Sequence, residues 1–520
     1  MLGGLGIATA LGAAAGAVVL LPLAELGSVS DRAEGLGWAW STRLAYWPRN
    51  LLTFLKPYVN GDISNNTYGG PSVFWEDYGY VGVAPFLLAL YGSVREWRRP
   101  LVAFAIGMTL VAYLIVLGPA TPVYRLVYEL VPGMKLFRFP TRFLIVVELG
   151  LAVLAGIGLT RLGSGLKRRF SAESPRAPRL IVLTLCLGTA LDLFIHQPRQ
   201  NPMVPAGEWL AAPRAVDVVR SGSSQPRTFT PHHRALHRRA FVLAHGWANV
   251  NPYFDLRDVL QPNIGGGFWA TPSADCYSGI APRWYVNVWG DHNRQGLLVS
   301  QLTQLDFKER TLTVHPALVK VLRTYGVSHL LSAYPQKGAP LALVSQNGNA
   351  YVYRVDGAAR VRFVRAARHV STDAEAAARL LDLSFDPDRE ILLHDAPDSV
   401  RPTVAEAGDA SSNTAATQAV VTREDPRQVV IEAEAPADGF LLLADTFYPG
   451  WTAQVDGTPA PVYRANLSVR GIRLPKGRHE VRFMYDAPGF TRGVQITLVA
   501  ISILLLWAGA AVYVDRRIRR

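Results

Sequence analysis

The run of apolar residues from Phe143 to Leu162 constrains the fold of this chain more than any other feature. Its length of about 20 residues is what an α-helix needs to cross a hydrocarbon core about 30 Å thick. Five other apolar segments are interpreted as membrane spans, namely residues 2–21, 80–94, 101–117, 180–195 and 493–514. Residues 2–21 lack the basic residues that precede the apolar core of a signal peptide, so we interpret them as a membrane helix. The chain of 520 residues is therefore predicted to contain an α-helical polytopic membrane domain of about six spans.

Basic residues beside the spans predict the orientation of the chain. They form three clusters, at residues 95–99, 167–179 and 516–520. Six spans place all three clusters on one side of the membrane, and short cytoplasmic loops are the ones enriched in Lys and Arg. We therefore predict a multi-pass protein of the cell membrane with a cytoplasmic C-terminus. Its extracytoplasmic segments are then residues 24–79, 118–142 and 196–492.

The long extracytoplasmic segment is predicted to be an α+β region followed by a C-terminal β-sandwich. Short alternating strands separated by turns begin near Val429 and continue to Tyr485, which is typical of a sandwich. Asp456-Gly457 and Pro475-Lys476-Gly477 are hairpin signals in this part. The predicted domains are residues 1–197 (transmembrane, with two extracytoplasmic loops), 198–400 (α+β), 401–492 (β-sandwich) and 493–520 (C-terminal transmembrane helix and basic tail).

A basic, aromatic and proline-containing stretch precedes the apolar run 143–162. Lys135, Arg138 and Arg142 lie in it, and Arg32 lies on the other predicted outer loop. Outward-facing cations run against the usual charge bias of membrane proteins, which points to a compensating role. Arginine presents a planar fork of donors that matches a phosphate, so Arg138 and Arg142 are predicted to hold a phosphate-bearing lipid, assisted by Lys135 and Arg32. The alternative is that these side chains extend to the interface or pair with nearby acids.

Two neighbouring acids, Glu76 and Asp77, lie just outside a predicted span. A base that assists group transfer to a hydroxyl must be within hydrogen-bond reach of it, which makes these two acids weak catalytic candidates. Adjacent acids more often pair with nearby arginines, so the sequence assigns no catalytic residue. Glu148 lies inside a span, where an ionisable side chain indicates either a functional site or a salt bridge to a neighbouring helix.

Other polar motifs exclude several classes of site. Four histidines lie close together in the sequence, at His232, His233, His237 and His245. The arginines between them repel a divalent cation, so we predict no metal site, and no cofactor is predicted either. The net charge is +13, but the basic clusters flank apolar runs, which favours a membrane partner over nucleic acid. Cys186 and Cys276 fall in a predicted span and a soluble segment, so no disulfide is expected.

Three stretches resemble the bacterial YfhO membrane-protein family. They are YELVPGMKLFRFPTR at residues 128–142, LADTFYPGWTAQVDG at 443–457, and a weaker match at Pro57, Tyr68-Gly69 and Tyr78–Gly82. The resemblance implies an envelope protein of the GT-C glycosyltransferase type, which moves a sugar from a polyprenyl-phosphate carrier to an acceptor outside the membrane. It also implies a catalytic carboxylate in the first extracytoplasmic loop. Because this chain begins inside a predicted membrane helix, we expect that loop to lie upstream, and no catalytic acid is transferred to a position here.

Two other classes of function remain open from the sequence. A non-catalytic envelope scaffold or glycan-binding membrane protein needs no catalytic loop. A transporter needs polar spans broken by Gly or Pro, for which Pro85 and Glu148 are the hints. The predicted partners are the lipid bilayer, a polyprenyl-phosphate-linked sugar and an envelope glycan acceptor, without nucleic acid.

Overall fold

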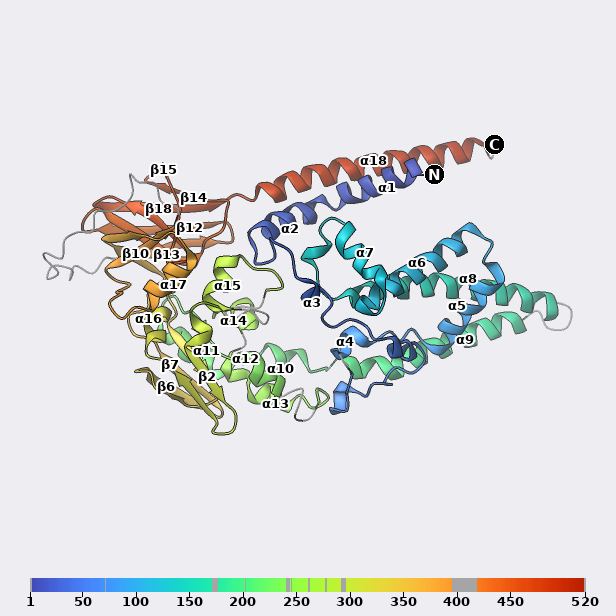
Figure 1. Cartoon of the computed structure of the whole chain (residues 1–520), viewed down its shortest axis with the longest axis horizontal. Helices are drawn as coiled ribbons and strands as arrows, with labels where there is room; N and C mark the ends of the chain where they lie inside the picture. Colours follow the sequence, from blue (N-terminus) through green and yellow to red (C-terminus); the bar gives the residue numbers. More distant parts are fainter. Residues whose placement is uncertain are drawn as a thin grey trace. The chain divides into compact units, whose positions relative to one another are not determined.

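The chain folds into two units, and Figure 1 shows its helices and strands coloured along the sequence. The computed structural model describes residues 2–70, 72–170, 176–201, 203–239, 244, 246–260, 262–275, 278–290, 296–394 and 419–518. The first unit contains Met1–Ala33, Ala212–His233 and Leu256–Arg520. The second unit contains Glu34–Ala211 and Arg234–Asp255.

The second unit is built on apolar helices. They are α5 (Val83–Glu96), α6 (Pro100–Val116), α8 (Leu144–Phe170) and α9 (Ala177–His196). Pro100 stands in the first turn of α6, where the missing N–H would have no helical partner anyway. Small and branched apolar side chains of α5, α6 and α8 form the core of this unit. Other apolar side chains on these helices, such as Leu149 and Leu183, are exposed, as in helices that face lipid.

Glycines let α5 and α8 approach each other closely. A Cβ atom added at Gly158 would lie 2.0 Å from the carbonyl oxygen of Leu88. One added at Gly92 would lie 2.6 Å from the carbonyl oxygen of Leu154. Helices in membranes commonly use small residues in this way, because close approach of the backbones maximises van der Waals packing.

In the first unit, a broken helix packs against the last described helix of the chain (Figure 1). The elements are α1 (Leu2–Ala15), α2 (Ala17–Val29) and α18 (Pro488–Ile518). The two halves of the broken helix meet at an angle of 77°. The hydroxyl oxygen of Thr497 accepts a hydrogen bond of 3.0 Å from the N–H of Val18, and it lies 3.2 Å from the carbonyl oxygen of Ala15. Thr497 on α18 therefore satisfies backbone groups that the break sets free.

Three helices in the described part of the chain are each long and apolar enough to cross a membrane: Pro140–Phe170, Ala177–His196 and Pro488–Ile518. The broken pair Gly6–Ala15 and Ala17–Val29 makes a fourth when counted as one span, and Pro100–Val116 is a shorter apolar helix. Apolar helices with a β-rich C-terminal region are thus present as predicted. By length and composition, the described residues support three or four spans instead of the six predicted.

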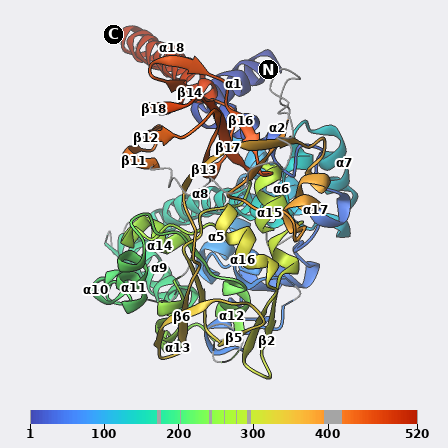
Figure 2. The ribbon, with the colours of Figure 1, turned by 90° about the vertical axis from the view of Figure 1, so that its left-hand side faces the viewer.

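Two sheets face each other in the first unit. The six-stranded sheet has the order β8 (Val361–Val364), β13 (Gly439–Thr446), β17 (Val469–Leu474), β16 (Tyr463–Ala465), β10 (Glu390–His394) and β9 (Ala366–His369). The five-stranded sheet has the order β11 (Ala419–Asp425), β12 (Gln428–Ala435), β18 (Gly477–Tyr485), β14 (Trp451–Val455) and β15 (Thr458–Ala460), and Figure 2 shows several of its strands side by side. Leu441 and Leu443 of one sheet pack with Ile431 and Phe483 of the other, as in a β-sandwich.

The opposite face of the six-stranded sheet is covered by helices. Phe440 and Leu442, which alternate with the inner residues of β13, pack into a second core with α16 (Ala317–Thr324) and α17 (Asp373–Leu381). A four-stranded sheet has the order β1 (Thr228–Phe229), β4 (His329–Ser332), β7 (Ala350–Arg354) and β6 (Ala342–Asn347). A three-stranded sheet has the order β2 (Thr303–Asp306), β3 (Thr311–Val314) and β5 (Gln336–Lys337).

Shorter helices complete the described structure. In the first unit they are α11 (Arg214–Gly222), η8 (Arg257–Val259), α14 (Pro262–Trp269), α15 (Arg283–Trp289) and η9 (Val299–Gln301). In the second unit they include α3 (Trp38–Ser41), η1 (Pro48–Phe54), η2 (Ile63–Asn65), η3 (Gly118–Ala120), η6 (Gln197–Gln200), α10 (Ala206–Leu210) and α13 (Asn251–Asp255). Helix α12 (His233–His237) begins at the boundary between the two units.

The strand pairing differs from the sequence prediction in two places. β8 pairs with β13 and β10 pairs with β16, so strands from both sides of residue 400 share one sheet. Asp456-Gly457 joins β14 to β15 in the predicted hairpin, with φ values of 50° and 81° that suit its tight turn. Pro475-Lys476-Gly477 instead leads from β17 into β18 of the other sheet, so the hairpin prediction there is wrong. Proline and glycine indicate a turn, but they do not determine which strand the chain joins next.

Candidate functional site

Two arginines lie close to one aromatic ring at the start of α8. η5 (Pro140–Phe143) leads directly into that helix, and Phe139 precedes it with a left-handed backbone (φ 67°). The guanidinium carbon of Arg138 lies 4.4 Å from the centre of the Phe139 ring, and that of Arg142 lies 5.4 Å from it. Arg138 is half-buried and Arg142 is exposed. We call residues 138–142 the arginine turn, and it brings together the two cations predicted to hold a phosphate.

Buried hydrogen bonds hold the arginine turn in place. The N–H of Phe139 donates to the carbonyl oxygen of Ser41 at 3.2 Å, and the Ser41 hydroxyl donates to the carbonyl oxygen of Phe137 at 3.1 Å. The hydroxyls of Ser41 and Tyr124 lie 2.5 Å apart, and Tyr124 belongs to α7 (Pro122–Leu130). Both residues are buried. A left-handed φ is unfavourable for a bulky residue, so these contacts offset the strain at Phe139.

The arginine turn also binds one of the two candidate acids. Glu76 lies in α4 (Phe74–Asp77), and one of its carboxylate oxygens accepts a hydrogen bond of 2.7 Å from the hydroxyl of Thr141. Thr141 is buried, whereas Glu76 is half-buried. The hydrogen bond therefore holds a partly accessible carboxylate at the turn that carries Arg138 and Arg142.

Asp77, the second candidate acid, is only 2 % exposed. Its carboxylate accepts a hydrogen bond from the hydroxyl of Tyr68. Burial raises the pKa of Asp77 to about 6, and the hydrogen bond from Tyr68 opposes this rise. A carboxyl group so deeply buried does not reach an acceptor hydroxyl in this conformation, so Asp77 fits a role in positioning α4 and Glu76.

Lys135 already has an acidic partner. Its ammonium group lies 2.7 Å from Glu129, which is also 2.8 Å from Arg125 one helical turn earlier on α7. The hydrogen bond from Lys135 lowers the pKa of the exposed Glu129. η4 (Met134–Leu136) presents Lys135 near the ring of Tyr128 as well, at 5.3 Å. The predicted pairing with a nearby acid therefore applies to Lys135.

Arg32 and Glu148 lie outside the arginine turn. Arg32 belongs to the first unit, where its side chain is buried and donates to the carbonyl oxygen of Gly279. Arg32 therefore belongs to a different unit from Lys135, Arg138 and Arg142. Glu148 lies on α8 and, among the described residues, makes no salt bridge to a neighbouring helix.

The histidine-rich segment forms no metal centre in the part of the chain that the structure describes, where no group of three His, Cys, Asp or Glu residues could hold an ion. His232, His233 and His237 are half-buried, and His245 lies outside the described residues. Burial lowers the pKa of His232 and His237. Cys186 is a free, exposed thiol, and Cys276 lies outside the described residues.

Sequence reasoning found the arginines of this site but missed the residues that hold them. Ser41 and Tyr124 come from separate segments, and a single hydroxyl residue has no periodicity that would mark it. Thr141 lies between the two predicted cations, in the stretch 128–142 that resembles the YfhO family, but nothing in the sequence marks its hydroxyl as the partner of Glu76. A comparison of this chain with protein-family models, with curated proteins and with solved structures gives no match.

Proposed function

We propose that this chain is a membrane glycosyltransferase-like protein of the YfhO type, which moves a sugar from a polyprenyl-phosphate carrier to an envelope glycan acceptor. The observation that supports this proposal is the arginine turn. Two arginines lie close to the ring of Phe139 at the beginning of an apolar helix, and Glu76 is hydrogen-bonded to the same turn. The N-terminal end of a helix carries a partial positive charge, which adds to the attraction for a phosphate.

The surroundings of the arginine turn suit a lipid-linked donor. Leu130, Val131 and Phe137 are apolar side chains with exposed fractions between 45 % and 74 %. Trp47, Leu51, Leu52 and Leu55 around η1 are also about half exposed. Such residues are favourable in the headgroup and acyl region of a bilayer, where a prenyl chain lies. In this proposal the cations hold the phosphate while the apolar side chains contact lipid.

The chemistry of the proposal assigns different roles to the charges. The oxygen of the acceptor hydroxyl bonds to the anomeric carbon of the sugar as the bond from that carbon to the carrier phosphate breaks. Arg138 and Arg142 stabilise the negative charge that grows on the leaving phosphate. Glu76 takes the proton of the acceptor hydroxyl, since it is the half-buried acid at the turn. The proposal also adopts six spans, with the arginine turn and the β-sandwich outside the cell.

The test replaces Arg138 and Arg142 by alanine, singly and together, in the full chain. Membranes carrying each variant are assayed for sugar transfer from a polyprenyl-phosphate donor. Loss of fixed charge stabilisation is expected to slow transfer about 100-fold in the double variant. Arg43→Ala is the matched control, because Arg43 is an exposed arginine of the same unit that stacks 4.9 Å from the ring of Trp40. Sugar transfer that is unchanged in the double variant contradicts the proposal. If the parent chain binds the donor but transfers no sugar, the result favours the non-catalytic scaffold.

A further inference from the structure

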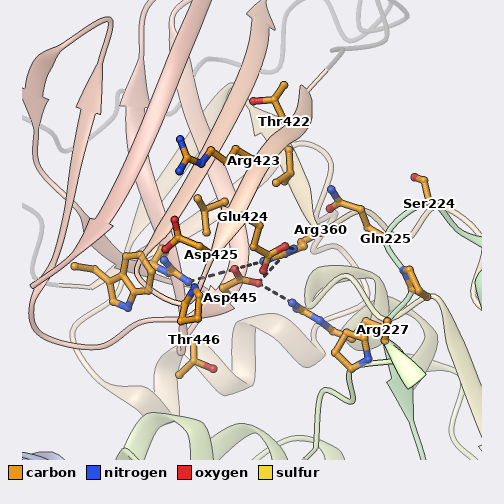
Figure 3. Close-up of a pocket in the computed structure, with 18 residues that line it drawn as sticks. Ser224, Gln225, Arg227, Arg360, Thr422, Arg423, Glu424, Asp425, Asp445 and Thr446 are labelled. Carbon is orange, nitrogen blue, oxygen red and sulfur yellow. Dashed lines mark hydrogen bonds and ion pairs between the residues drawn. The ribbon is translucent and has the colours of Figure 1, made fainter. Parts of the chain in front are cut away.

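A second cluster of arginines lies within the first unit, at a cavity of about 730 Å³. Residues of the five-stranded sheet, of the six-stranded sheet and of the segment before β1 line this cavity. Figure 3 shows Arg227, Arg360 and Glu424 around Asp445. The volume of the cavity lies within the range of small-molecule sites, which is about 300–1,000 Å³.

Asp445 is the centre of the cluster. Arg227 donates to its carboxylate at 2.6 Å, Arg360 donates at 2.7 and 3.0 Å, and Arg470 donates at 3.2 Å. Burial alone would raise the pKa of Asp445, but the charge of Arg227 and the hydrogen bonds from Arg360 outweigh it and lower that pKa. Asp445 is therefore ionised, and it neutralises one of the three guanidinium charges.

Arg470 has donor capacity that the described residues leave unused. Its side chain is 4 % exposed, and its Nε and Nη1 atoms are buried without a hydrogen-bond partner among the described residues. Its guanidinium carbon lies 3.8 Å from the centre of the Trp451 ring. Stacking on a ring satisfies the face of a guanidinium, but it leaves the in-plane N–H groups without acceptors. A buried donor without an acceptor is unfavourable, so an acceptor brought by a ligand would stabilise this arrangement.

Glu424 stands at the exposed side of the cluster. It accepts two hydrogen bonds from Arg360, at 2.7 and 2.8 Å, in the two-pronged geometry that arginine offers to any carboxylate or phosphate. The Glu424 side chain is 51 % exposed, whereas that of Arg360 is 14 % exposed. Glu424 lies on β11, an edge strand of its sheet. Because the Glu424 carboxylate is half exposed, it can return to water when a ligand anion takes its place on Arg360.

We propose that this cavity binds the carboxylate or phosphate group of an anionic small molecule, which contacts Arg470 and displaces Glu424 from Arg360. The three arginines and two acids leave one positive charge in excess, which favours an anionic ligand over a neutral one. Polar side chains such as Ser224, Gln225 and Thr446 also line the cavity and can bind the rest of a polar molecule. The inference does not depend on the proposed transferase function, because the arginine turn belongs to the second unit.

The test measures binding to the purified full chain in detergent by isothermal titration calorimetry. The probes are glucuronate, glucose 6-phosphate and glucose, which share a sugar ring but carry a carboxylate, a phosphate or no charge. Binding of one or both anions without binding of glucose is expected, and the stronger anion identifies the ligand chemistry. The proposal is overturned if neither anion binds to the parent chain or to Glu424→Gln. It is also overturned if glucose binds as tightly as the anions.

Two variants with matched controls assign the binding to this cavity. Glu424→Gln removes the competing carboxylate and is expected to tighten anion binding about two- to fivefold. Arg470→Gln removes the buried donor and is expected to weaken binding about tenfold or more. The controls are Glu480→Gln and Arg478→Gln. They change an exposed acid and an exposed arginine on β18 of the five-stranded sheet, outside the cavity lining, and should leave anion binding unchanged. Because Glu424 is half exposed, Glu424→Gln is expected to fold and tests the displacement even if Arg470→Gln does not fold. Anion binding by Glu424→Gln that is unchanged or weaker contradicts the proposed displacement.

Discussion

Among the candidate acids, Asp77 shows how burial changes the chemistry of a single side chain. Glu76 next to it stays half-buried and bonded to Thr141, whereas Asp77 is enclosed with Tyr68. The raised pKa of Asp77, about 6 compared with an ordinary value of 3.8, means that the folded chain keeps a proton that the unfolded chain has lost. Between these two values, raising the pH therefore destabilises the fold.

Replacing Asp77 by asparagine removes this dependence. The wild-type chain is expected to lose stability as the pH rises from about 4 to about 6, whereas Asp77→Asn has no proton to lose at this position. The stability of the variant relative to wild type should therefore increase between pH 4.5 and pH 7. Thermal unfolding of the purified proteins in detergent at the two pH values measures this difference, and a difference that is independent of pH contradicts the assignment.

Glu129→Gln provides a control with the opposite sign. Its pairing with Lys135 lowers the pKa of Glu129, so the stabilisation is present at neutral pH and disappears as the pH falls through that lowered value. This variant should therefore be slightly destabilised at pH 7 and approach wild type in acid. The effect is small, since the pair is exposed to solvent.

At the scale of elements, the crossing of α5 and α8 depends on the absence of side chains. Gly92 and Gly158 face each other across the contact, and carbonyl oxygens occupy the space that a Cβ atom would need. The same α8 follows the arginine turn, so the crossing and the candidate site share one helix.

Gly158→Leu should separate the two helices. Overpacking of a tight contact costs about 1–3 kcal/mol, so the thermal unfolding midpoint should fall by several degrees. Gly156→Leu is the matched control. Gly156 lies on the same helix, and a Cβ atom added there would meet no other atom within 4 Å. Equal midpoints for the two variants would show that the close crossing does not exist in the protein.

Elements were more predictable than sites, for a physical reason. Hydrophobic runs and alternation predict the helix around Phe143–Leu162 and strands such as β12 and β17, because these patterns repeat along the chain. The arginine turn was predicted because its cations are close in sequence. The Asp445 cluster was not, since Arg227, Arg360 and Arg470 come from distant segments that only the tertiary fold brings together.

At the scale of the whole molecule, the orientation in the membrane decides which chemistry is accessible. The proposed transfer needs the arginine turn outside the cell, where envelope glycans lie. The basic residues near the end of α8 then lie in the cytoplasm, as the distribution of Lys and Arg predicts.

Cysteine labelling in intact cells tests this orientation. In a chain with Cys186 and Cys276 replaced by serine, Thr458→Cys in the β-sandwich should react with a membrane-impermeant maleimide. Arg168→Cys should react only after the membrane is permeabilised. Both positions are exposed, so access to reagent is not limited by the fold. The reverse pattern of labelling would place the sandwich in the cytoplasm and exclude the proposed transfer.

The contact between Thr497 and the break after α1 has a consequence for biosynthesis. The N–H of Val18 and the carbonyl oxygen of Ala15 form hydrogen bonds with Thr497 of α18. These two residues emerge from the ribosome long before α18, because more than 450 residues separate Val29 from Pro488. At bacterial and eukaryotic synthesis rates this delay is roughly 20–90 s. During that time the broken segment must find water, lipid headgroups or a helper protein for its backbone groups. The contact at the break between α1 and α2 therefore forms only after α18 has been synthesised.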